Sequence, residues 1–351
     1  MCGIVGFTGK RPAAPILLDG LSKLEYRGYD SAGLAVRDGE ALAEVVKAKG
    51  RLTNLVEKTD AGKALKGACG IGHTRWATHG EPSQINAHPH VSGNCSKSGS
   101  GAVESEVVGV HNGIIENYTE LKEKLLKHGY TFYSQTDTEV VVKLVDYYYK
   151  KYNLGPIDAI AKTMVRVRGS YALELMFRDY PGEIWVARKD SPMIIGIADG
   201  ETYVASDVPA ILKYTRNVYY IGNLEFAKLT PGEAHFYDLN GDEIEKGRRY
   251  YDTAEIEVLP RYLCRSDGEI RAAKGHRRLE SSPQVHAAVL SGYTETRRQS
   301  ESGGGGFAAA ERNGAGGIKA GEKRDTDREA ERGGNCCSRQ HCRECRFSFW
   351  Q

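Results

Sequence analysis

Hydrophobic and polar residues follow short, regular patterns along the first 257 residues, as is typical of a folded domain. Apolar residues at helical spacing predict helices over residues 14–26, 117–129 and 136–152. Short apolar runs punctuated by glycine predict strands over residues 2–9, 31–39, 41–50, 67–75 and 107–115. From about Ser170 the pattern is again that of strands, at residues 171–179, 183–190, 193–199, 201–207, 218–222 and 233–244. The chain therefore predicts an α+β layered domain with many strands.

Turn and cap residues support several of these boundaries. Asp38-Gly39 lies between two predicted strands and favours a hairpin there. The helix over residues 117–129 ends on a glycine, and Thr136 or Asp137 can cap the start of the next helix.

The regular pattern stops after about Val258. Residues 261–351 contain only ten Leu, Ile, Val or Phe, which is too little apolar surface for a packed core. They carry 17 Lys or Arg and 12 Asp or Glu, whereas residues 1–260 carry 31 and 34, so a basic tail follows a slightly acidic body. We predict that residues 258–351 are a low-complexity, disordered tail.

Composition narrows the class of protein further. No stretch approaches the roughly 20 apolar residues of a membrane span, and the first residues lack the order of a secretory signal. Cys2, Cys69 and Cys95 are the cysteines of the first 260 residues, and they are too scattered for a disulfide framework. We therefore expect a cytoplasmic location, with no membrane partner.

A cysteine cluster near the end of the tail raises the question of a metal. Cys336, Cys337, His341, Cys342 and Cys345 are all zinc-ligand types. No second paired half follows across a structured loop, and the flanking residues offer no packing. We predict no metal site and no cofactor.

Three spaced segments behind Cys2 carry the candidate chemistry. They are LEYRGYDSAG from Leu24, GHTRWATHGEPSQINAHPH from Gly72 and HNGIIEN from His111. Taken singly, each has a structural interpretation, as does Cys2, which can simply begin a buried strand. These interpretations make Gly28 and Gly33 turns, Arg75 a surface charge, Trp76 a core residue, Asp137 a helix cap and His111-Asn112-Gly113 a hairpin turn.

Taken together, the segments indicate acyl transfer from an amide. If Met1 is removed, Cys2 carries both a nucleophilic sulfur and a free α-amine, whose unperturbed pKa is about 7.7 to 8.0. The nucleophile and the base then lie on one residue. Such a reaction also needs donors for an oxyanion. An asparagine side chain followed by a glycine N–H, as at Asn112-Gly113, can supply two.

With these motifs the chain resembles the class II glutamine amidotransferases, and among them the glutaminase domain of the glutamine–fructose-6-phosphate aminotransferase (glucosamine-6-phosphate synthase) family. YRGYDSAG and HTRWATHG carry the resemblance, which covers residues 1–257. It implies a four-layer αββα sandwich of the N-terminal nucleophile hydrolase type. It also implies hydrolysis of L-glutamine to glutamate and ammonia. The intact family enzyme transfers this ammonia to fructose 6-phosphate to form glucosamine 6-phosphate.

The resemblance implies catalytic roles for four residues. Cys2 would be the nucleophile, with its own amine as the general base through a water. Asn112, by its side chain, and Gly113, by its N–H, would form the oxyanion hole. Arg27 is similar to the family's arginine near the N-terminal cysteine.

The resemblance also implies how glutamine is held. Arg75 and Thr78 would bind its α-carboxylate, and Asp137 its α-ammonium. Trp76 and His79 belong to a loop similar to the family's lid. The other histidines are assigned structural roles: His73, His88, His90 and His111.

Several expectations concern the chain as a whole. The sugar-isomerase domains of the family are absent, so fructose 6-phosphate is a partner only if a synthase domain is supplied. A homodimer is expected for the intact family enzyme, and no nucleic-acid partner is expected. The loop at residues 93–106 is a polar insertion beside the lid segment. Two alternatives stay open: another class II amidotransferase, or a catalytically silent glutamine-binding or regulatory protein.

The abrupt loss of pattern after residue 257 leads to a first prediction, that residues 258–351 are an out-of-frame translation. Sequencing the gene across codons 250–270 tests it. An intact sugar-isomerase frame in another phase is the expected result, and the cysteine cluster then has no function. If no such frame exists, the hypothesis is wrong.

Overall fold

The computed structural model describes residues 2–93 and 100–252. The predictions for the tail at residues 258–351, with its cysteine cluster, lie outside the described residues. Part of the loop at residues 93–106 also lies outside them.

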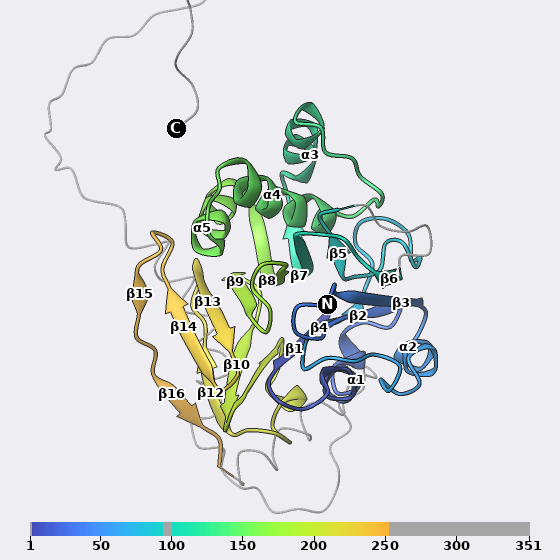
Figure 1. Cartoon of the computed structure of the whole chain (residues 1–351), viewed down its shortest axis with the longest axis vertical. Helices are drawn as coiled ribbons and strands as arrows, with labels where there is room; N and C mark the ends of the chain where they lie inside the picture. The colour runs from blue at the N-terminus through green and yellow to red at the C-terminus, as the bar shows by residue number, and fades with distance from the viewer. Residues whose placement is uncertain (1, 94–99, 253–351) are drawn as a thin grey trace, which may run out of the picture. The chain divides into compact units, whose positions relative to one another are not determined.

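Two antiparallel sheets form the centre of the described domain (Figure 1). The first sheet runs in the order β16 (Arg248–Tyr250), β12 (Asn217–Tyr220), β10 (Ile194–Ala198), β11 (Glu201–Ala205), β1 (Gly3–Thr8), β4 (Cys69–Arg75), β2 (Ser31–Arg37), β3 (Glu44–Lys49) and β6 (Gly101–Ala102). The second runs in the order β15 (Glu243–Ile244), β14 (Glu233–Tyr237), β13 (Glu225–Thr230), β9 (Ile184–Lys189), β8 (Gly169–Phe177), β7 (Val107–Ile115) and β5 (His90–Val91).

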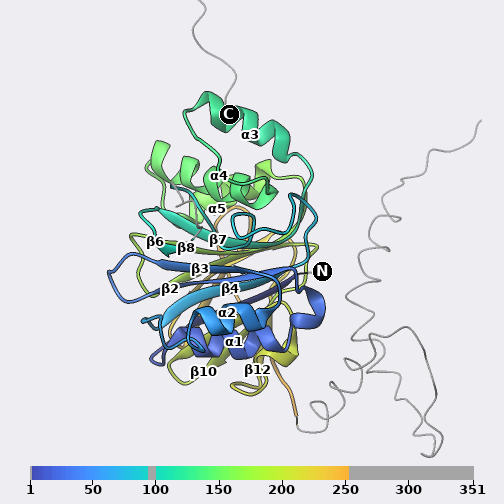
Figure 2. The same cartoon turned by 90° about the vertical axis from the view of Figure 1, so that its right-hand side faces the viewer.

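Helices cover the outer face of each sheet, as Figure 2 shows edge-on. The first sheet carries α1 (Ala13–Ser22) and α2 (Leu52–Lys58), and the second carries α3 (Tyr118–Lys127), α4 (Asp137–Lys151) and α5 (Pro156–Arg166). Two short 3-10 helices, η1 (Glu25–Arg27) and η2 (Val208–Ala210), complete the described elements. The result is an αββα sandwich, which confirms the predicted four-layer fold.

The buried apolar residues form three layers between these four. Val5 and Phe7 of β1 belong to the cluster beneath α1, whereas Ile4 belongs to the cluster between the two sheets. A third cluster lies between the second sheet and the helices α3 to α5. Because successive side chains of a strand point to opposite faces, a strand buried on both faces needs apolar residues at every position. This explains why the start of the chain is a continuous apolar run.

Local signals placed several boundaries correctly. The predicted hairpin is confirmed, because β2 pairs with β3 and Gly39 has a φ of +47°. The helix α3 ends just before Gly129, whose φ is +86°. At the start of α4 the Thr136 side chain accepts a hydrogen bond from the Glu139 N–H at 3.3 Å, so Thr136 is the N-cap.

Other elements differ from the prediction. Helix α1 ends at Ser22, because the chain turns into η1 and carries Arg27 toward the start of β1. The helices α2 and α5 and the strands β5, β6, β13 and β16 were not predicted. The predicted strand over residues 233–244 is two strands, β14 and β15, joined by a turn at Gly241 with a φ of +87°.

One buried acid stands out in the layer between the sheets. Glu174 of β8 is fully buried, and neither of its carboxyl oxygens has a hydrogen-bond partner among the described residues. It faces Gly6 of β1, at which an added Cβ would lie 3.1 Å from a Glu174 oxygen. Burial raises the pKa of Glu174 well above its usual range, so the carboxyl group is protonated in the native state at neutral pH.

This protonation predicts a pH-dependent gain in stability from Glu174→Gln. As the pH rises above about 4.3, the unfolded chain releases the Glu174 proton while the native chain keeps it. The free energy of unfolding therefore falls by about 1.4 kcal/mol per pH unit. The amide has no proton to lose. Urea unfolding at several pH values between 5 and 8 should therefore show an advantage of the variant that grows with pH.

The matched control is Glu123→Gln, on the exposed face of α3. This control should unfold like the parent chain at every pH. A Glu174→Gln advantage that is the same at pH 5 and pH 8 would contradict the predicted protonation.

Candidate active site

Strand pairing brings Cys2 beside the end of β4. Gly3 pairs with Thr74 in the register of β1 and β4, so Cys2 lies next to Arg75 and Trp76. Asn112 reaches the same place from β7 of the other sheet, where it contacts Cys2 directly. Segments far apart in the sequence thus meet at one end of the sandwich.

The sulfur of Cys2 contacts the backbone of Trp76. The Trp76 N–H donates to Sγ at 3.2 Å, and Sγ lies 3.5 Å from the Trp76 carbonyl oxygen. Burial raises the pKa of the Cys2 thiol, although the Trp76 N–H and the charge of Arg75 oppose this effect. The thiol is therefore mostly protonated at neutral pH and needs a base to become a nucleophile.

The carbonyl oxygen of Cys2 accepts two hydrogen bonds. Arg27 Nε donates to it at 3.1 Å, and Asn112 Nδ2 donates to it at 3.0 Å. The Arg27 guanidinium in turn lies 3.5 Å from a carboxylate oxygen of Asp207. The structure thus brings together Cys2, Arg27 and Asn112, which the sequence had placed in three separate segments.

Asn112 and Gly113 lie within β7 and not in a turn, so the hairpin-turn interpretation of this segment is wrong. Asn112 Oδ1 lies 2.9 Å from His73 Nε2, and Asn112 Nδ2 lies 2.9 Å from Ser206 Oγ. Gly113 has a φ of +133°, and a Cβ there would overlap the carbonyl oxygen of Ser170 in β8. Only glycine fits this position without strain.

Arg75 is buried, so its interpretation as a surface charge is wrong. Its guanidinium donates to the carbonyl oxygens of His79 and, at 3.1 Å, Gly80. The segment that follows β4 therefore folds back over the arginine. Burial lowers the pKa of Arg75, but a guanidinium remains charged at neutral pH.

The other residues of this segment are more exposed. The side chain of Trp76 is 48% exposed and makes an edge contact with the ring of Tyr29, so its interpretation as a core residue is wrong. Thr78 Oγ1 lies 3.3 Å from His79 Nδ1, and the His79 ring packs edge-on against Tyr118 of α3.

Asp137 is the first residue of α4, and the N-cap role belongs to Thr136. The Asp137 Oδ2 atom accepts a hydrogen bond from the Ile115 N–H at 3.0 Å and lies 3.9 Å from His111 Nδ1. The buried carboxylate of Asp137 thus connects the start of α4 to the end of β7, which is the strand that carries Asn112 and Gly113.

Four histidines form a buried group beneath the site. The ring centroids of His73 and His88 are 4.0 Å apart, and those of His88 and His90 are 4.9 Å apart. Burial lowers the pKa of His73 to about 3 and the pKa values of His88, His90 and His111 below their usual range. All four are neutral at physiological pH, which agrees with structural roles.

The two motif glycines serve close packing and not turns. Gly33 lies within β2, where a Cβ would overlap the carbonyl oxygen of His88. At Gly28 a Cβ would lie 2.6 Å from the carbonyl carbon of Arg75. Both glycines therefore let the segment that contains Arg75 and His88 pack against the first motif.

Sequence reasoning missed Ser206 and Asp207, which follow β11 and contact Asn112 and Arg27 respectively. A Ser-Asp pair after a strand is a common turn signal. Nothing local reveals these two contacts, because Asn112 and Arg27 lie more than 90 residues away in the sequence.

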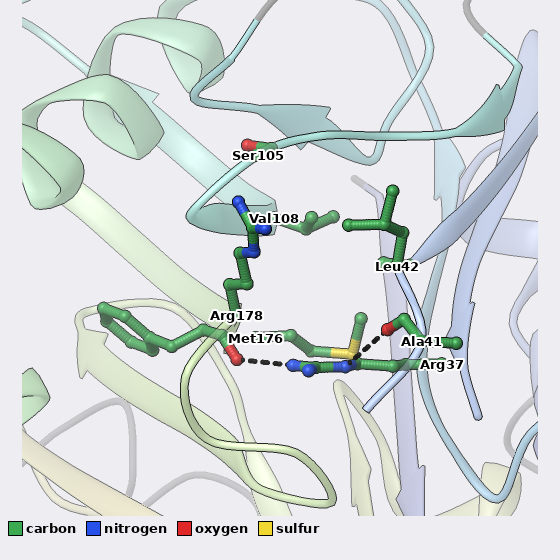
Figure 3. Close-up of a pocket in the computed structure, with 9 residues that line it drawn as sticks. Arg37, Ala41, Leu42, Ser105, Val108, Met176 and Arg178 are labelled. Atoms are coloured by element: carbon green, nitrogen blue, oxygen red, sulfur yellow. Dashed lines mark hydrogen bonds between the residues drawn. The ribbon is translucent and has the colours of Figure 1, made fainter. Parts of the chain in front are cut away.

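A small cavity, drawn in Figure 3, lies at the Arg37 end of β2. Arg75 of β4 pairs with Ser31 at the other end of that strand, so the cavity is away from Cys2. Arg37, Leu42, Val108, Met176 and Arg178 are among its lining residues. Arg37 donates to the carbonyl oxygens of Ala41 and Phe177, each at 2.9 Å. The cavity volume of about 10 Å³ suits a single water and not a substrate.

Two further findings concern the described residues alone. No group of three or more His, Cys, Asp or Glu in them is arranged to hold a metal ion. None of their helices combines the length and the apolar character needed to cross a lipid bilayer.

Comparison with known proteins identifies the fold and the family of the domain. Residues 99–213 match the model of a glutamine amidotransferase domain. Two solved structures share the fold: glutamine phosphoribosylpyrophosphate amidotransferase from B. subtilis, with a TM-score of 0.57 and 25% identity, and an allosteric regulatory enzyme of purine biosynthesis, with 0.58 and 27%. Each covers 68% of this chain and is itself covered to 49%.

Curated relatives are more similar in sequence. Glutamine–fructose-6-phosphate aminotransferases from Caldanaerobacter subterraneus and Clostridium acetobutylicum are each 51% identical over 70% of this chain. The enzyme from Methanosarcina mazei is 45% identical over the same share. The chain spans 38 to 39% of the length of these relatives.

The fold and the similarity define a class II glutamine amidotransferase domain of the N-terminal nucleophile type. Within that class, the domain belongs with the glutamine–fructose-6-phosphate aminotransferases.

Proposed function

We propose that this chain hydrolyses L-glutamine to glutamate and ammonia, with Cys2 as the nucleophile. The observation that carries the proposal is the surroundings of Cys2. The Cys2 sulfur accepts a hydrogen bond from the Trp76 N–H, and the side-chain amide of Asn112 donates one to the Cys2 carbonyl oxygen. A nucleophile and a donor for developing negative charge thus lie side by side.

Removal of Met1 supplies the base. The thiol pKa is raised by burial, so the sulfur cannot rely on spontaneous ionisation. The α-amine exposed by the cleavage has a pKa of about 7.7 to 8.0 and accepts the thiol proton, through a water. Arg27, by holding the Cys2 carbonyl oxygen, fixes the backbone that carries both groups.

The reaction then proceeds in two stages. The sulfur attacks the side-chain amide carbon of glutamine, and the carbonyl oxygen becomes an oxyanion beside Asn112 Nδ2 and the Gly113 N–H. The amine returns its proton to the leaving nitrogen, the C–N bond breaks, and ammonia departs from a γ-glutamyl thioester. Water, activated by the same amine, attacks the thioester carbon, and glutamate and the thiol are released.

Charged groups around the site suit the ends of glutamine. The guanidinium of Arg75 is a planar donor that suits the α-carboxylate of glutamine. It also donates hydrogen bonds to the His79 and Gly80 carbonyl oxygens, so glutamine binding is linked to the position of the Trp76–His79 segment. We propose that Thr78 assists Arg75, that Trp76 and His79 cover the substrate, and that the Asp137 carboxylate receives the α-ammonium.

The acceptor of the ammonia follows from the relatives. Their names give fructose 6-phosphate as the acceptor substrate, and they exceed this chain in length. We propose that the chain performs the glutaminase half of that reaction, and that transfer to the sugar requires a synthase part. Identity of 51% to these relatives, against 25 and 27% to the purine-pathway structures, favours this acceptor.

The function predicts that Cys2→Ala abolishes glutamate release. The parent chain, shown by mass to begin at Cys2, should release glutamate from L-glutamine in an enzyme-coupled assay, and the variant should fall to background because the reacting sulfur is gone. A chain that retains Met1 should also be inactive, since its amine is displaced from the sulfur.

The matched control is Cys69→Ala, because Cys69 is the other described cysteine and is buried in β4. Burial raises the pKa of Cys69 to about 12, so its thiol is inert. Equal glutamate release by the parent chain and the Cys2→Ala chain would contradict the proposed nucleophile.

The substrate-binding role predicts that Asp137→Asn weakens binding more than turnover. The amide oxygen can still accept the Ile115 N–H, but the charge that attracts the α-ammonium is lost. We expect KM to rise about 10- to 100-fold, with kcat within about threefold. Asp146→Asn, on the same helix but bonded to Tyr130, is the control with unchanged KM. An unchanged KM for Asp137→Asn would assign this residue to the fold alone.

A further inference from the structure

The buried side chain of Asn112 is held at both ends of its amide. Its Oδ1 atom lies 2.9 Å from His73 Nε2. Its Nδ2 atom lies 2.9 Å from Ser206 Oγ and 3.0 Å from the Cys2 carbonyl oxygen. His73 is fully buried, Asn112 is 5% exposed and Ser206 is 3% exposed, so water does not compete freely for these contacts.

The carbonyl oxygen of His111 determines where His73 carries its proton. This oxygen lies 3.1 Å from His73 Nε2, and a carbonyl can only accept a hydrogen bond. Nε2 must therefore be the protonated nitrogen of the neutral ring. The same N–H points to Asn112, whose nearer atom must then be the acceptor Oδ1.

Ser206 secures the other end of the amide. Its hydroxyl oxygen accepts the backbone N–H of Ile4 at 2.8 Å and an Nδ2 hydrogen of Asn112. The second Nδ2 hydrogen is then directed to Cys2. In the flipped orientation, the Asn112 oxygen would face the carbonyl oxygen of Cys2, and two acceptors would oppose each other.

We propose that His73 and Ser206 are positioning residues that lock the Asn112 amide with its N–H groups toward Cys2. Neither residue touches the reacting atoms. They act by keeping a donor, and not an acceptor, on the Cys2 side of the amide, so that the Nδ2 hydrogen now bonded to the Cys2 carbonyl oxygen can turn to the oxyanion. The effect on rate rests on the proposed glutaminase function, whereas the firmness with which the amide is held can be measured independently of it.

The first experiment compares two reactions of Cys2 in the Ser206→Ala chain. Glutamine hydrolysis passes through an oxyanion, and loss of one oxyanion donor typically costs about 10²- to 10³-fold in kcat. Because the donor is loosened and not removed, we expect kcat to fall about tenfold or more, with KM within about twofold. Iodoacetamide forms an S–C bond at Cys2 and expels iodide without an oxyanion, so the rate of alkylation, followed by mass on the Cys2 peptide, should be unchanged.

The matched control is Ser92→Ala. Ser92 is also buried, and its hydroxyl also accepts one backbone N–H, from Val107 at 3.1 Å. It makes no bond to the residues around Cys2. This variant should lose thermal stability comparable to that of Ser206→Ala but keep its kcat. A second pair tests the imidazole: His73→Gln keeps an N–H donor and should retain more of kcat than His73→Leu.

Exchange of the Asn112 side-chain amide protons with solvent measures how firmly the amide is held. In the parent chain we expect these NMR signals, assigned by their absence from Asn112→Ala, to exchange slowly with solvent, and to exchange faster in Ser206→Ala. Unchanged exchange overturns the inference, as does an unchanged kcat of Ser206→Ala in an active parent. If the parent itself releases no glutamate, the proposed function is wrong, and amide exchange alone decides the inference.

Discussion

Burial of β1 on both faces is the constraint on which the rest of the structure depends. The strand lies between β11 and β4 in its own sheet, beneath α1 on one side and against the second sheet on the other. Such a strand is held by ladder bonds and by apolar contacts along its whole length. Cys2, directly before it, therefore has a fixed position at the end of the interface between the sheets, where side chains of both sheets can reach it.

The polar groups around Cys2 keep fixed positions because they are buried and are either neutral or paired. The histidines beneath the site have lowered pKa values, so they act as fixed hydrogen-bonding groups and not as charges. In such an environment each hydrogen bond is strong and each wrong orientation is costly. Glu174 is the contrasting case, because it has no hydrogen-bond partner among the described residues and keeps its proton instead.

Prediction from sequence was most accurate where local rules act alone. The Asp38-Gly39 hairpin and the Thr136 cap follow from turn and cap chemistry. The αββα fold was predicted in a different way, from the resemblance of the motifs to a known family. Prediction failed where distant contacts override local preference, as at the early end of α1, which turns so that Arg27 reaches Cys2. The exposed Trp76 and the buried Arg75 reverse the usual preferences of their residue types for the same reason.

The sequence by itself determined the class of the domain and the residue types that its chemistry requires, because these are written in contiguous motifs around Cys2, Arg75 and Asn112. Only the tertiary structure decided which atoms meet. The bond of Asn112 to Ser206 joins residues 94 positions apart, and that of Arg27 to Cys2 joins residues 25 apart. No local pattern encodes such contacts, since they arise from strand register and from the packing of two sheets across one buried layer.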